Sequence, residues 1–139
     1  MPKHNNEMLE MKEIVSLGMS LRAIEQKILK PGYHQGTKRI WFQGDEPYFD
    51  VFFELKNEDI VWFQVTLRGS SLSWSKKNGL QTGSTNELSI DNVIFYPASK
   101  IIENDSQINW NFIELVKTIF QARGNEEIFA KALGLFHER

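Results

Sequence analysis

Residues 40–75 constrain the fold of this chain most, because apolar and polar residues alternate there through four short runs. A period of two is typical of β-strands, whose successive side chains point to opposite faces of a sheet. Turn-prone residues separate the runs by only a few positions. The stretch therefore predicts a meandering antiparallel sheet.

The positions of the apolar residues predict the register of the first hairpin in this stretch. In residues 49–55 and 60–68 the apolar residues that recur at every second position, Val61 among them, are odd-numbered. Both sets can face the core only if paired positions sum to an even number. A three-residue loop at 57–59 meets this condition and supplies turn-prone residues.

In the next hairpin the paired positions must sum to an odd number, because the large apolar residues Leu72 and Trp74 are even-numbered. A two-residue loop at 69–70 provides it, and the glycine in its first position suits a type II′ turn. This register places Leu72 opposite Leu67 and Trp74 opposite Val65.

Further strands are predicted on both sides of this block. Residues 38–43 form the strand before it, and residues 80–85 form a weaker strand after it. The turn at 77–79 has either two or three loop residues, and the choice decides which face Gln81 occupies. Residues 93–96, which Pro97 follows, are a candidate sixth strand.

Helices are predicted before and after the sheet. An apolar stripe at gaps of three and four predicts a helix over residues 6–30, which Gly18 weakens by about 1 kcal/mol relative to alanine. A second stripe extends from Ile108 to Ala122 and predicts a helix that Gly124 caps. A last helix follows, with Asn125 as its N-cap. The order predicts an α+β fold: an N-terminal helix, an antiparallel meander of five or six strands, and two C-terminal helices packed on the sheet.

Length and composition restrict the class of protein. A chain of 139 residues fits one domain, 1–139, with residues 1–6 frayed, and is long enough to bury a core without stabilising disulfides. It has no cysteine, which excludes disulfides and thiolate zinc sites. Its net charge of −2 argues against a nucleic-acid partner. Neither a signal peptide nor an apolar run long enough to span a bilayer is present, so we expect a cytoplasmic protein that does not enter a membrane.

No catalytic, cofactor or metal signature is found in the sequence. Asp50 and Glu54 share one strand face, but they are about 13 Å apart along it and are expected to be solvent-exposed charges. His34, in the loop at residues 31–36, is the histidine best placed to act as an acid or base. Catalytic residues, metal ligands and cofactors are therefore all predicted to be absent.

The outer face of the sheet is the best functional candidate. Its aromatic residues Trp41, Tyr48, Phe52 and Trp62 are interleaved with polar groups that include Arg68. Tryptophan, tyrosine and arginine often dominate the binding energy of interfaces. Three interpretations stay open at this point: cover by the chain's own helices, contact with a partner or second copy, or a small-ligand site.

The preferred hypothesis is a non-catalytic binding or adaptor domain that engages a protein partner, or itself as a homodimer, through these five residues. A permanent structural subunit would use the same surface. The alternative hypothesis is a small enzyme or ligand pocket at one end of the sheet. It would use His34 with Asp45 or Glu46, and Lys38 or Arg39 would hold an anionic small molecule.

Overall fold

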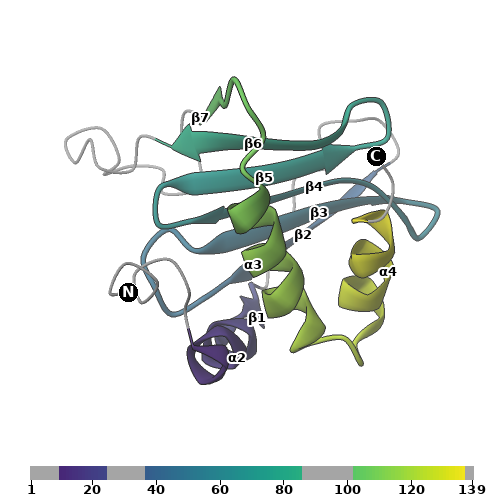
Figure 1. Ribbon diagram of the computed structural model, residues 1–139. Helices are drawn as coiled ribbons and strands as arrows, with labels where there is room; N and C mark the ends of the chain where they lie inside the picture. Colours follow the sequence, from purple (N-terminus) through teal and green to yellow (C-terminus); the bar gives the residue numbers. More distant parts are fainter. Residues whose placement is uncertain (1–9, 25–36, 86–101, 137–139) are drawn as a thin grey trace.

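A computed structural model describes residues 10–24, 37–85 and 102–136 of the chain. In these residues the chain forms one antiparallel sheet whose strands are arranged in sequence order (Figure 1). The strands are β1 (Arg22–Ala23), β2 (Lys38–Gln43), β3 (Asp50–Lys56), β4 (Asp59–Leu67), β5 (Ser70–Ser75), β6 (Gly79–Thr85) and β7 (Ile102–Asn104). The predicted α+β meander is confirmed, with seven strands where five or six were expected. The two short edge strands, β1 and β7, were missed because two or three residues carry no readable periodicity.

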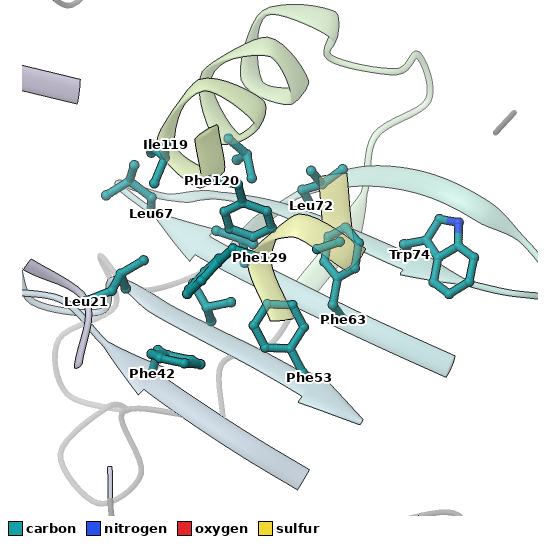
Figure 2. Close-up of a cluster of buried hydrophobic side chains, with 14 of the residues drawn as sticks. Leu21, Phe42, Phe53, Phe63, Leu67, Leu72, Trp74, Ile119, Phe120 and Phe129 are labelled. Atoms are coloured by element: carbon teal, nitrogen blue, oxygen red, sulfur yellow. The ribbon is translucent and has the colours of Figure 1, made fainter. Parts of the chain in front are cut away.

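Three described helices lie on one face of this sheet (Figure 1). They are α2 (Met11–Ser20), α3 (Trp110–Gln121) and α4 (Glu127–Leu135). The core forms between them and the sheet, where rings from β2, β3 and β4 meet Phe120 of α3 and Phe129 of α4 (Figure 2). The centroids of the Phe120 and Phe129 rings are 5.2 Å apart, and the Phe53 ring lies 5.7 Å from that of Phe129. Burying each such ring contributes roughly 1.5–3 kcal/mol.

Helix α2 ends at Ser20, well before the predicted end at residue 30. Leu21 turns the backbone to an extended conformation, and the chain then pairs with β2 as β1. The guanidinium of Arg123 donates hydrogen bonds to the carbonyl oxygens of Gly18 and Leu21, at 2.8 and 2.6 Å. A cation at this helix end adds hydrogen bonds to carbonyl groups there, including that of Gly18, which also accepts the Leu21 amide, and it complements the helix dipole. The helix therefore ends where a distant residue caps it.

The hairpin between β3 and β4 reaches the predicted register by a different route. Val51, Phe53 and Glu54 pair as expected with residues 65, 63 and 62. The loop, however, has two residues, Asn57 and Glu58, which have φ of 53° and 69° as a type I′ turn requires. A β-bulge restores the parity, so that Ile60 enters the core and Val61 does not.

The hairpin between β4 and β5 keeps the predicted faces but shifts the register by two residues. Leu72 pairs with Val65 and Trp74 with Phe63, because the loop consists of Arg68 and Gly69. Their φ values of 52° and 85° indicate a type I′ turn, so the predicted type II′ turn at 69–70 is wrong. A shift of two residues preserves parity, and both apolar side chains therefore stay on the core face.

The remaining elements lie close to where the sequence predicts them, with small differences at their ends. The β5–β6 loop has three residues, 76–78, because Ser75 pairs with Gly79, and Gln81 consequently faces away from the core. The side chain of Asn109 caps α3 by accepting from the Phe112 amide. Glu126, not Asn125, is the N-cap residue of α4. The candidate strand at 93–96 lies outside the described residues, and none of the described helices is long and apolar enough to cross a bilayer.

Candidate binding site

The sheet face opposite the helices is built from three rows of paired residues that run across the strands. The first row is Arg39, Glu54, Trp62, Ser75 and Gly79, the second is Trp41, Phe52, Gln64, Ser73 and Gln81, and the third is Gln43, Asp50, Thr66, Ser71 and Gly83. We call this surface the outer face. Its large side chains stand on β2, β3 and β4, whereas serine and glycine dominate on β5 and β6. The face therefore has an aromatic half on β2 to β4 and a low half, made of small side chains, on β5 and β6. Its third row is largely buried, at Asp50, Thr66, Ser71 and Gly83.

Arg39 organises the aromatic half of the outer face. Its guanidinium lies 5.3 Å from the centre of the Phe52 ring and 5.4 Å from that of Trp62, within the range of cation–π attraction. It also donates a hydrogen bond of 2.9 Å to the carboxylate of Glu54. The Trp41 ring stacks on Phe52 with centroids 5.6 Å apart. These contacts hold the rings in fixed positions on the strands.

The two carboxylates of this face are buried, contrary to the prediction that they are solvent-exposed. Asp50 and Glu54 are each 1 % exposed. Each has a charged or polar partner beside it, since the Trp41 indole nitrogen donates a 2.9 Å hydrogen bond to Asp50 and Arg39 pairs with Glu54. Buried charges require such partners. The alternation along β3 did not reveal these partners, because they lie on the neighbouring strand β2.

A groove of about 610 Å³ lies where the aromatic half meets the low half, at the end of the sheet near the β5–β6 turn. Trp62 and Val61 line it on the β4 side. Ser73, Ser75 and Gln81 line it from β5 and β6. The small serine side chains next to a tryptophan explain why this part of the face is hollowed. A volume of this size is typical of ligand-binding clefts.

Three lysines surround this groove. Lys56 comes from the end of β3, and Lys76 and Lys77 come from the β5–β6 turn, where Asn78 also lines the groove. All three lysines are exposed. Ser75 fixes the turn, because its hydroxyl accepts the Asn78 amide at 3.0 Å. None of the described residues lining the groove is acidic, so its charge is positive although the whole chain carries −2.

The five residues predicted as the binding site do not form one cluster. Trp41, Phe52 and Trp62 belong to the outer face, as expected, with Phe52 buried at 8 % exposure. Tyr48 lies in the turn before β3, with φ of 63°, where its carbonyl accepts a hydrogen bond from Thr66. Arg68 lies in the β4–β5 turn.

Arg68 has a structural role at the opposite end of the sheet from the groove. It donates to both carboxylate oxygens of Glu46 and lies 3.6 Å from Glu13 of α2. The hydrogen bonds between the two side chains hold the pKa of Glu46 below its usual range and raise the pKa of Arg68, although partial burial opposes both shifts. Arg68 therefore links the β4–β5 turn both to the β2–β3 connection, through Glu46, and to α2, through Glu13.

The described components of the alternative pocket lie toward opposite ends of β2. Lys38 begins β2, whereas Asp45 and Glu46 follow its other end, and six extended residues span roughly 16–20 Å. Arg39 is engaged with Glu54. His34 lies outside the described residues. Within the described ranges, three histidine or carboxylate side chains nowhere gather as a metal site would require.

Sequence reasoning missed Ser73, Ser75, Lys56, Lys76 and Lys77. The signal was present, since serine occupies every outward position of β5 and two lysines follow directly. Small residues at alternate positions of a strand indicate a low surface beside larger neighbours. Lys56, by contrast, joins the other lysines only through the folding of the sheet. The chain matches no protein-family model, no curated protein and no solved structure.

Proposed function

We propose that this chain is a non-catalytic binding domain that engages a protein partner through the outer face of its sheet. The groove beside Trp62 supports this function most directly. It combines a concave shape, an aromatic wall and a polar floor. Interfaces are enriched in tryptophan at their centres and place hydrogen-bonding groups around it.

The contacts of Arg39 with Glu54 and with the aromatic rings favour a binding role for Trp62 over a purely structural one. Its ion pair and ring contacts hold Trp62 in place before any partner arrives. A side chain that is already fixed loses little conformational entropy on association, so preorganisation raises affinity. Trp62 is half-buried, which leaves part of its surface available for contact.

Site-specific photocrosslinking in cells tests this function. A benzoylphenylalanine residue at Gln81, which is exposed in the groove, is expected to capture a defined protein that mass spectrometry can identify. The same residue at Glu114, which is exposed on α3, serves as the matched control. Light scattering of the purified chain would show whether the captured partner is a second copy.

The crosslink must also depend on the groove. Introducing Ser73→Trp, which fills the floor, is expected to abolish capture at Gln81, provided that a thermal melt shows the variant folded. Equal capture at Gln81 and Glu114, or no capture at Gln81, would contradict a binding role for the outer face.

A further inference from the structure

We propose that the groove beside Trp62 binds an acidic, extended peptide segment of a protein partner. This inference rests on the proposed function and names the chemistry of the partner. Its carboxylates would pair with Lys56, Lys76 and Lys77, and an apolar side chain between them would contact the Trp62 ring.

Charge is the first argument. The lysines come from the end of β3 and from the β5–β6 turn, and the fold brings them to one opening that contains no described acidic side chain. Like charges placed together in this way repel one another, and an anionic ligand relieves that repulsion. Lysine ammonium groups on flexible stems can adjust to carboxylates spaced along an extended chain.

The floor of the groove is the second argument. Ser73 and Ser75 on β5 and Gln81 on β6 line the groove and offer hydroxyl and amide groups. Such groups can donate to and accept from the backbone of a peptide. The Ser75 hydroxyl already accepts the Asn78 amide, so its own proton is directed to another acceptor.

The limited extent of the positive charge favours a peptide over a nucleic acid. Beyond Lys56 the β3–β4 turn carries Glu58 and Asp59, both exposed. Asp59 also lines a neighbouring groove of about 540 Å³ that shares Lys56 and Lys76 with the first. A nucleic-acid strand would meet these carboxylates after a few phosphates, whereas nucleic-acid binding usually requires a longer basic track.

Fluorescence anisotropy with defined peptides tests the proposal on the full chain. The probe is a labelled octapeptide of six glutamates and two phenylalanines. Control probes are the same peptide with glutamine in place of glutamate, and a labelled 15-nucleotide deoxythymidine strand. The acidic peptide is expected to bind, to weaken as salt is raised, and to bind at least fivefold more tightly than the glutamine peptide.

Lysine and serine variants test whether the acidic peptide binds in the groove. The double change Lys76→Gln with Lys77→Gln is expected to weaken acidic-peptide binding about fivefold or more. Lys12→Gln with Lys117→Gln, on the helix layer, removes the same charge and is expected to change it less than twofold. Ser73→Asp places a carboxylate on the floor and should weaken binding further, with thermal melts confirming that each variant is folded.

Several results would overturn the proposal. These are equal binding of the glutamine and glutamate peptides, equal loss in the two lysine doubles, absence of acidic-peptide binding at millimolar concentration, or tighter binding of the deoxythymidine strand. A captured partner in the crosslinking experiment together with a failed peptide titration would leave the binding function standing and reject the acidic occupant. Failure of both experiments rejects both.

Discussion

Gly18 shows how one residue can weaken an isolated helix and yet be required by the fold. A Cβ at this position would lie 2.8 Å from the carbonyl oxygen of Ile119 and 3.0 Å from the Cβ of Ala122. The absence of a side chain therefore lets α2 approach the backbone of α3. The helical propensity that glycine costs is about 1 kcal/mol, which this close packing offsets.

Gly18→Ala is expected to destabilise the protein, because the clash with α3 costs roughly 1–3 kcal/mol and exceeds the gain in helical propensity. Gly134 in α4 is the matched control, since a Cβ there would meet nothing within 4 Å. Gly134→Ala should stabilise the protein by up to about 1 kcal/mol. Urea denaturation measures both changes, and stabilisation by Gly18→Ala would mean that the two helices are not in close contact.

In the β4–β5 hairpin, too, the conformation of the turn residues depends on contacts made elsewhere in the fold. Its two loop residues, Arg68 and Gly69, both adopt positive φ, which matches the twist of the strands they connect. Glycine takes this conformation without strain, whereas arginine is held there while its side chain bonds Glu46. Turn and ion pair thus support one another.

Gly69→Val is expected to cost about 1–3 kcal/mol, because a β-branched residue is strained at φ of 85°. Ser70→Ala, at the first residue of β5, is expected to be close to neutral. Thermal melts of both variants compare the two positions directly. Similar melting temperatures for Gly69→Val and the wild type would show that the turn lies elsewhere and that the outer face must be redrawn from β5 onward.

Arg123 connects three parts of the whole molecule. From the segment between α3 and α4 it caps α2, pairs with Glu126, and stacks over the Phe129 ring at 5.1 Å. Its side chain is well shielded, at 12 % exposure. Hydrogen bonds from a charged group to such partners are among the stronger ones.

Arg123→Gln is expected to lower the free energy of unfolding by about 2–3 kcal/mol, because the carbonyl groups of Gly18 and Leu21, at the end of α2, lose a charged donor. Arg22→Gln is the control, since Arg22 pairs with Asp45 where both side chains are more than half exposed. That change is expected to stay within about 0.5 kcal/mol. Equal effects in urea denaturation would show that Arg123 does not hold α2 in place.

The ion pair between Arg123 and Glu126 affects the pH dependence of stability. The hydrogen bonds from Arg123 lower the pKa of Glu126 below its ordinary value near 4.5. A lowered folded-state pKa adds stability above the ordinary value, and that contribution is lost as the pH falls through the folded pKa. Arg123→Gln should therefore lose less stability between neutral and acidic pH than the wild type does.

The sequence by itself determined most of the residues that face the core, because a period of two and the parity of each hairpin specify the faces even when a turn is misplaced. The exception is Ile60, which enters the core where Val61 was predicted. The Arg68–Gly69 loop differs from the predicted one by one position, and the bulge near Val61 replaces a longer loop, yet Phe63, Val65 and Leu72 remain buried. Shifts of two residues and bulges that restore parity leave the pattern intact.

Only the tertiary structure decided the remaining features, because each depends on residues distant in the chain. Arg123 ends α2 from more than 100 positions away. Asp50 and Glu54, which the sequence alone presents as surface charges, are buried and bonded to partners on the neighbouring strand. The groove likewise needs Lys56, Trp62 and Ser73 from three strands, and no local pattern specifies a surface that exists only after those strands have paired.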